Sequence, residues 1–387
     1  MATRLFLESE QHPRGAAGWS LAPSARMRAI VICCLLLLAP ASTFAQSPRL
    51  SADALARRAS EALEEKRFGD ALAAFTEAVG IRPRDAELWT GKGMTEFLLG
   101  QNEQAETSLV RALTLNPKLT DASLFLGEVQ YRSGRAADAI ATYESALKHA
   151  PGEETIVAKL EHWRKDVRFS ERMYESRGSH FRVLFEGPAD QAMARRAVEY
   201  LEAAYWRIGA ALTTYPQGAT TVVLYTIQQF RDITRAPDWS GGVYDGQIRV
   251  AVKGALDHPE ELERVLAHEF VHAVVAKTGG HVPLWLNEGL ATLFEPGGVE
   301  WARSVLEDAS ERIGLERLHG SFRRLEGATV TIAYAESAVA VRRMIDLRGA
   351  ASVMALLQDL QHGVPFESAF HQRMAMRYED FRSMLQR

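Results

Sequence analysis

Apolar and small residues recur every 34 residues between positions 53 and 153. Two columns hold small residues, others hold apolar residues, and a proline closes each unit. These columns are Ala59, Gly93 and Gly127; Ala71, Ala105 and Ala139; Phe75, Leu109 and Tyr143; Ala78, Ala112 and Ala146; and Pro83, Pro117 and Pro151. Small residues let paired helices approach, and proline cannot continue a helix. The pattern therefore predicts three helix pairs that bury their apolar faces only by stacking on one another.

This spacing resembles the tetratricopeptide repeat (TPR) and implies a three-unit, all-α solenoid over residues 51–153. The chain departs from the family at its aromatic column. Ala62, Glu96 and Gln130 stand there, and Leu63, Phe97 and Tyr131 follow one residue later. The resemblance implies a concave surface for a protein or peptide partner, and a spacer or dimerisation module is the alternative.

A charged segment follows the repeats. Its residues from Thr155 to Ser176 predict a helix that caps the solenoid, within a capping and linking region over residues 154–178. The pattern then changes to one typical of strands. Strands are predicted at Phe181–Phe185, Thr221–Tyr225 and Gln247–Lys253.

A long helix is predicted between the first two strands, from Ala192 to Leu212. Its aromatic residues Tyr200, Tyr205 and Trp206 are expected to lie in the core. Everything after Pro259 has the pattern of helices. A small sheet thus precedes a helical half.

One predicted helix, over residues 257–280, is apolar nearly all round. Its apolar residues are Val265, Leu266, Ala267, Phe270, Val271, Ala273, Val274 and Val275. A helix of this kind is buried. His268, Glu269 and His272 interrupt it, and polar side chains in such a place are costly unless something satisfies them.

The spacing of these three residues suits a metal site. Histidines four residues apart project from one face, and each can direct a nitrogen at one ion about 2.0–2.1 Å away. Glu269 lies beside that ion, where it can take a proton from a bound water. The alternative is that the three are hydrogen-bonded core residues that hold no metal.

A second predicted helix, Pro283 to Ala291, carries Glu288 in its interior. An unpaired carboxylate there would be costly, and an ion held by two neutral histidines is the partner that it lacks. The tight Gly279-Gly280 connection makes the two helices neighbours. Two histidines and a glutamate with one open position are typical of a catalytic zinc site. We therefore predict one Zn²⁺ per chain, held by His268, His272 and Glu288.

The sequence HEFVH at residues 268–272, followed by NEGLA at 287–291, resembles the gluzincin zinc metallopeptidases, and most of all the peptidase-MA-like family. Many members of that family carry TPR repeats before the catalytic domain. The resemblance implies a zincin-like domain over residues 179–387, in which Glu269 is the general base of peptide hydrolysis. It also implies that the strand Gln247–Lys253 is the sheet edge along which a peptide substrate lies.

The same resemblance singles out Tyr334, in the AYAES segment at residues 333–337. Gluzincins often supply a Tyr or His from the helical half to stabilise the oxyanion, so Tyr334 is a candidate catalytic residue, and a core aromatic anchor is the alternative. Asn287 and Thr292 are candidates for hydrogen bonds that orient the ligands, or for capping and packing. His281 is expected to be a capping or surface residue and not a fourth ligand.

The N-terminus has the pattern of a secretory signal peptide. Arg26 and Arg28 precede the apolar run Ala29–Ala39, and the small residues of Thr43-Phe44-Ala45 follow. The run is too short to span a bilayer. We therefore predict a signal peptide with an upstream extension over residues 1–46 and an exported, periplasmic or secreted bacterial protein with no stable transmembrane anchor.

Composition narrows the chemistry further. Both cysteines, Cys33 and Cys34, lie inside the predicted signal peptide, so the mature chain would have neither disulfides nor thiolate ligands. The formal charge is −4 and the basic residues are dispersed, so nucleic acid is not expected as a partner.

Taken together, these patterns predict an α+β chain in which an all-α TPR solenoid precedes a zincin-like domain made of a small mixed sheet and a helical C-terminal half. The predicted function is zinc-dependent hydrolysis of peptide bonds in exported proteins or peptides, with the repeats binding protein. Two alternatives remain: a zinc hydrolase of non-peptide bonds, and a TPR scaffold whose zinc-binding domain is not proteolytic.

Overall fold

The computed structural model describes residues 50–187, 190–234, 242–252, 259–319, 322, 325 and 327–386. Residues 50–387 form one compact unit. The predicted signal peptide lies outside the described residues and stays a prediction. Across the described ranges, no helix is both long and apolar enough to cross a membrane.

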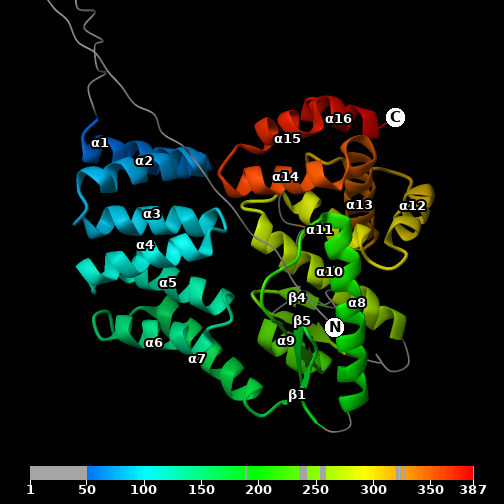
Figure 1. Cartoon of the computed structure of the whole chain (residues 1–387), viewed down its shortest axis with the longest axis horizontal. Coiled ribbons are helices and arrows are strands. Elements are labelled where there is room, and N and C mark those ends of the chain that lie inside the picture. Colours follow the sequence, from blue (N-terminus) through cyan, green and yellow to red (C-terminus); the bar gives the residue numbers. More distant parts are fainter. Residues whose placement is uncertain are drawn as a thin grey trace, which may run out of the picture. The chain divides into compact units, whose positions relative to one another are not determined.

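The predicted repeats form three helix pairs, so the solenoid is confirmed. Its helices are α1 (Ala52–Glu64), α2 (Phe68–Ile81), α3 (Ala86–Leu98), α4 (Asn102–Leu115), α5 (Thr120–Arg132) and α6 (Ala136–Leu147). Figure 1 shows them stacked one on the next, from blue to green. The small column is needed for this contact: a Cβ added at Gly93 would lie 2.6 Å from Leu109, and one at Gly127 would lie 2.2 Å from Tyr143.

The charged segment after the repeats forms α7 (Glu154–Ser170), which packs on α6. Trp163 of α7 lies against the rings of Tyr131 and Tyr143, with centroids 4.7 and 4.5 Å away. The prediction of a helix as far as Ser176 is wrong, because the chain forms strand β1 (Tyr174–Arg177) there. This strand pairs antiparallel with β2, a long-range contact that the local charge pattern does not encode.

The five-stranded sheet has the order β1-β2-β3-β5-β4. Its other strands are β2 (Phe181–Phe185), β3 (Thr220–Tyr225), β4 (Gly242–Tyr244) and β5 (Ile248–Ala251). β2, β3 and β5 are parallel, whereas β1 and β4 are antiparallel to their neighbours. The predicted strand Gln247–Lys253 is therefore not the edge of the sheet. The chain turns at Gly246, so β4 pairs with the side of β5 that faces away from β3, and β5 lies between β3 and β4.

Helices cover both faces of the sheet. Alternate residues such as Val222 and Val250 face α8 (Gln191–Leu212) and the helical half, and their neighbours Val223 and Tyr225 pack against α9 (Ile227–Thr234). Tyr205 of α8 is buried as expected, but the expectation for Trp206 is wrong, since its side chain is 58% exposed.

From Pro259 onward every described element is a helix, as predicted. These are α10 (Pro259–Thr278), α11 (Leu284–Leu293), α12 (Gly298–Asp308), α13 (Ala328–Arg348), α14 (Ala350–Gln361), α15 (Phe366–Met374) and α16 (Tyr378–Leu385). One apolar core joins α8, the sheet and most of these helices.

A buried guanidinium connects the solenoid to the sheet. Arg249 of β5 is 1% exposed, and its Nη atoms donate to both carboxylate oxygens of Asp166 in α7, each at 2.8 Å. They also donate to the hydroxyls of Tyr131 at 3.0 Å and Tyr225 at 2.6 Å. The Nε atom donates to Asp245 at 2.9 Å. Burial opposes ionisation of Asp166, but the Arg249 guanidinium holds the pKa of that carboxyl below its usual value.

We expect Arg249→Met to destabilise the protein by about 3–5 kcal/mol, because it leaves the Asp166 carboxylate buried without its cation. Arg342→Met is the matched control: Arg342 is 48% exposed in its pair with Asp346, and loss of an exposed pair costs about 1 kcal/mol or less. Urea unfolding followed by circular dichroism measures both. Equal, small shifts of the two midpoints would contradict the role given to Arg249.

Candidate metal centre

Three helices position the residues of the site. His268, Glu269 and His272 lie on α10, Glu288 lies on α11, and Tyr334 lies on α13. Helices α11 and α13 touch through Gly289, where an added Cβ would lie 2.4 Å from the Ser337 carbonyl oxygen. A glycine beside Glu288 thus allows α13 to approach the site.

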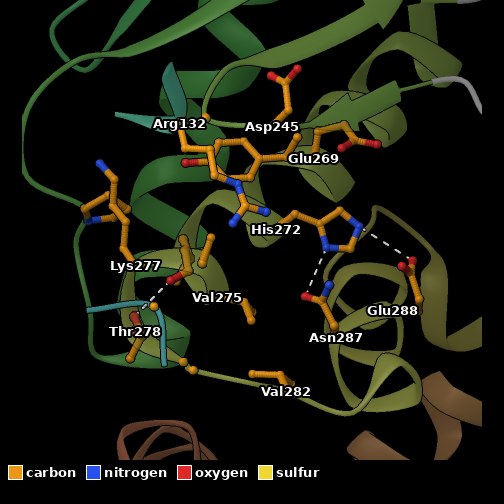
Figure 2. A pocket seen from close by; sticks show the side chains of 18 of the residues that line it. Arg132, Asp245, Glu269, His272, Val275, Lys277, Thr278, Val282, Asn287 and Glu288 are labelled. Atoms are coloured by element: carbon orange, nitrogen blue, oxygen red, sulfur yellow. Dashed lines mark hydrogen bonds and ion pairs between the residues drawn. The ribbon is translucent and has the colours of Figure 1, made fainter. Parts of the chain in front are cut away.

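The structure brings the three predicted ligands together. One ligand atom from each of His268, His272 and Glu288 lies within 4.8 Å of the other two, and no other such group occurs among the described residues. The Nε2 atom of each histidine is 3.5 Å from the same oxygen, Oε2 of Glu288. Figure 2 shows the His272 ring between Asn287 and Glu288.

The other ring nitrogens have partners of their own. His268 Nδ1 donates to Glu295 Oε1 at 2.6 Å, and His272 Nδ1 donates to Asn287 Oδ1 at 3.1 Å. Arg264 also pairs with Glu295, at 3.0 Å. These contacts select the tautomer in which Nε2 carries no proton when the ring is neutral, so both Nε2 lone pairs are available.

Glu295 was not among the predicted residues, whereas Asn287 was. Glu295 follows the end of α11, so the period of that helix does not place it. No periodic signal in the sequence therefore points to Glu295.

The charges in the cluster favour a cation. Burial opposes a charge on His268, yet the Glu288 and Glu295 carboxylates raise its pKa to about 10. Burial likewise opposes ionisation of Glu288, but His272 and His268 lower the pKa of its carboxyl. Anionic carboxylates thus face two imidazoles, and a positive charge between them is stabilised.

The donor set fits a zinc ion. Ligand atoms about 2.0–2.1 Å from a tetrahedral metal are about 3.3–3.4 Å apart. The two distances of 3.5 Å between Nε2 and Glu288 match this spacing and exceed an ordinary hydrogen bond. Two nitrogens and one carboxylate oxygen are ligands that zinc takes in open, catalytic sites.

Glu269 lies beside this cluster and is 5% exposed. Its Oε2 atom has no hydrogen-bond partner among the described residues. Burial raises the pKa of its carboxyl, although His272 and His268 lower it. The edge strand β4 passes directly over it, since a Cβ added at Gly242 would lie 2.6 Å from Glu269 Oε1. A carboxylate in this position is available to a water or substrate.

Tyr334 reaches the site as well. Its ring centroid is 6.1 Å from that of His268, and it lines the same cavity. Burial and the nearby Glu288 and Glu269 carboxylates raise the pKa of its phenol, so the hydroxyl keeps its proton. The sequence left open whether Tyr334 is a hydrogen-bond donor that faces the cleft or an aromatic anchor in the core. Its position agrees with a donor that faces the cleft, and its role in catalysis stays a prediction.

The remaining predicted residues lie near the cluster. Thr292 is buried, and its hydroxyl has no hydrogen-bond partner among the described residues, so a hydrogen bond to a ligand is not seen. His281 is exposed, with its ring 5.5 Å from that of Phe68, and it is not part of the metal-binding group.

The chain matches two known families. Residues 206–383 match the Peptidase MA superfamily. Residues 56–118 and 91–154 each match the tetratricopeptide repeat. The C-terminal part is therefore a Peptidase MA superfamily domain, and TPR repeats precede it.

Curated relatives share only short stretches with the chain. Hsp70-Hsp90 organizing protein 1 of Glycine max is 24% identical over 110 residues, which are 28% of this chain and 19% of that protein. Small glutamine-rich tetratricopeptide repeat-containing protein 2 of Mycosarcoma maydis is 24% identical over 105 residues, which are 27% of this chain and 30% of that protein. The chain thus spans less than a third of these relatives.

Solved TPR domains resemble the chain over a similar share. The first TPR of Spaghetti (RPAP3), bound to an HSP90 peptide, is 19% identical, covers 30% of this chain and 96% of its own, and has a TM-score of 0.30. The Sgt2 TPR domain from Aspergillus fumigatus is 20% identical, covers 34% and 88%, and has a TM-score of 0.31.

We expect Glu295→Gln to weaken zinc binding about 10–100-fold, because the charge that orients His268 is lost while the shape is kept. Competition with a chromogenic chelator measures the affinity. Glu300→Gln, at an exposed position of α12, is the control and should bind zinc like the unchanged protein. Equal zinc affinity in the two variants would show that Glu295 does not contribute to zinc binding.

Proposed function

We propose that this chain, which joins TPR repeats to a Peptidase MA superfamily domain, is a zinc-dependent peptidase. His268, His272 and Glu288 hold one zinc ion, and Glu269 is the general base. The convergence of the Nε2 atoms of His268 and His272 on one Glu288 oxygen, with the Glu269 carboxylate at their side, is the observation that carries this proposal.

The chemistry divides between the ion and the chain. When bound, zinc supplies Lewis acidity, which polarises the scissile carbonyl and acidifies a water. Glu269 accepts a proton from the attacking water and passes it to the leaving nitrogen. Burial raises the pKa of the Glu269 carboxyl, which makes it a stronger base than an exposed carboxylate. Strand β4 lies where an extended peptide can pair with the sheet edge above Glu269.

Tyr334 completes the proposed mechanism. Attack on a carbonyl places negative charge on its oxygen, and a fixed donor stabilises that charge. The Tyr334 phenol stays protonated and lies beside His268 and Glu288, so it is placed to donate a hydrogen bond there.

The setting of this activity is part of the proposal. The signal-peptide pattern before residue 47 supports export, to a bacterial periplasm or outside the cell. The substrate is then an exported protein or peptide. The repeats support the binding of a protein partner, as in the TPR domain of RPAP3 that is bound to an HSP90 peptide.

Two alternatives use the same site. A zinc hydrolase of non-peptide bonds would cleave esters and leave peptides intact. A TPR scaffold with a zinc-binding but non-proteolytic domain would cleave neither. The buried Glu269 favours an enzyme, because metal binding alone has no need of a carboxylate whose Oε2 atom has no hydrogen-bond partner among the described residues.

Metal analysis and a peptide screen on the purified protein test the proposal. We expect one zinc per chain, lost in His268→Ala, His272→Ala and Glu288→Ala. Glu269→Gln should keep the zinc but lose at least about 10²-fold in kcat, because an amide cannot accept the proton. Full zinc content in all three alanine variants would contradict the assignment of His268, His272 and Glu288 as ligands. An active Glu269→Gln protein would show that another group activates the water.

Tyr334→Phe removes only the hydroxyl. We expect kcat to fall by about 10²–10³-fold with KM little changed, as for a lost oxyanion donor. The thermal midpoint is measured beside the kinetics, because a core aromatic would affect stability and not kcat. An unchanged kcat would show that Tyr334 serves only as an aromatic anchor in the core.

A further inference from the structure

The cavity at the site has walls from two parts of the chain. It has a volume of about 1560 Å³, larger than the roughly 300–1000 Å³ of sites for small ligands, and so has room for several residues of an extended peptide. Glu269 and His272 line it from α10, and Tyr244 lines it from β4. The solenoid lines it with the turn after α3 and with Arg132 at the end of α5.

Backbone contacts fix the solenoid side of this cavity. A Cβ added at Gly100, in the turn after α3, would lie 3.0 Å from the carbonyl oxygen of Gly279, just past α10. Gln101 Nε2 donates to the Gln361 carbonyl at 2.7 Å. The turn between α3 and α4 is thus tied to the helical half that carries the site.

Arg132 is held even more closely to the edge strand. Gly246, in the turn between β4 and β5, has φ +107°, and a Cβ there would lie 2.2 Å from the Arg132 carbonyl oxygen. The preceding residue, Tyr131, is bound by Arg249. The position of Arg132 relative to β4 is therefore set by the fold.

The side chain of Arg132 enters the cavity. Figure 2 shows it among the residues that line the pocket, together with Asp245, Glu269 and His272. Its guanidinium lies over the Phe97 ring, 5.2 Å from the centroid, which orients it without neutralising it. Within the described residues no carboxylate lies at ion-pair distance from Arg132, and the nearby Asp245 is engaged by Arg249.

The repeat itself does not require this arginine. One and two periods earlier, the same column holds Leu98 and Glu64. A cation that the solenoid does not use, directed into a cleft, has the chemistry to bind an anion.

We propose that the solenoid forms one wall of the peptide-binding cleft and that Arg132 on this wall binds a carboxylate of the substrate. This rests on the proposed peptidase function and adds a substrate class to it. The carboxylate belongs to an Asp or Glu side chain or to the peptide C-terminus. Arg132 supplies a positive charge on the solenoid wall that attracts the carboxylate of such a peptide.

Binding to the zinc-loaded Glu269→Gln protein tests this without cleavage. Fluorescein-labelled ten-residue peptides carry Glu or Gln at one position at a time and end in a free acid or an amide. We expect the Glu form, or the free acid, to bind at least about tenfold more tightly than its neutral counterpart. Selectivity for Glu in amidated peptides identifies a side-chain carboxylate, and selectivity only for the free acid identifies the C-terminus.

Adding Arg132→Gln should reduce this ratio to about one, and Arg132→Glu should reverse it in favour of Lys-containing peptides. Arg111→Gln, at an exposed position of α4 outside the cavity, should keep the ratio of the parent. Zinc content and thermal midpoint confirm that each variant is folded.

An equal ratio in the parent and Arg132→Gln proteins, or no peptide binding at all, overturns the role of Arg132. Selective binding of acidic peptides by a protein whose Glu269 form cleaves none of them would instead reject the peptidase and leave Arg132 as a recognition residue.

Discussion

The Arg249 guanidinium is the interaction on which the arrangement of the molecule depends. Its donors reach Asp166 in the capping helix, Tyr131 in the solenoid, Tyr225 in the neighbouring strand and Asp245 in the turn beside β4. A buried charge is tolerated only when it is paired and its hydrogen bonds are satisfied. The solenoid is consequently bound into the same unit as the sheet. Because Asp245 directly follows β4, the contact between Arg249 and Asp245 also helps to position β4, the edge strand that passes over Glu269.

In the candidate metal centre, too, buried charged groups are paired with one another. Two imidazoles and three carboxylates, those of Glu269, Glu288 and Glu295, are gathered in a largely water-excluded place. Glu295 and Asn287 each hold one histidine by Nδ1, which leaves the Nε2 atoms directed at Glu288. A positive charge at the centre of this arrangement is stabilised by the carboxylates, and a divalent cation would supply it. Burial in the same place raises the pKa of the Glu269 carboxyl, although His272 and His268 lower it.

The solenoid also lines the cavity at the candidate metal centre. TPR arrays are known for their concave surface, whereas here the ends of α3 and α5 meet the Peptidase MA superfamily domain and line its cavity. The solenoid and the Peptidase MA superfamily domain therefore line one cavity. A protein partner bound to the repeats would therefore contact the same helices that line this cavity.

The sequence by itself determined the repeats, most of the other helices, three of the strands and the residues that the structure brings together as a metal-binding group. The 34-residue period, the apolar helix interrupted by His268, Glu269 and His272, and the isolated carboxylate of Glu288 are local patterns, so helix geometry alone placed these side chains on shared faces. Only the tertiary structure decided that β4 and not β5 is the edge of the sheet, that β1 replaces the end of a predicted helix, and that Glu295 and Arg132 face the site. Each of these depends on contacts between residues far apart in the chain. Strand pairing, the course of the chain beyond a helix end and the meeting of two domains leave no period in the sequence from which they could be read.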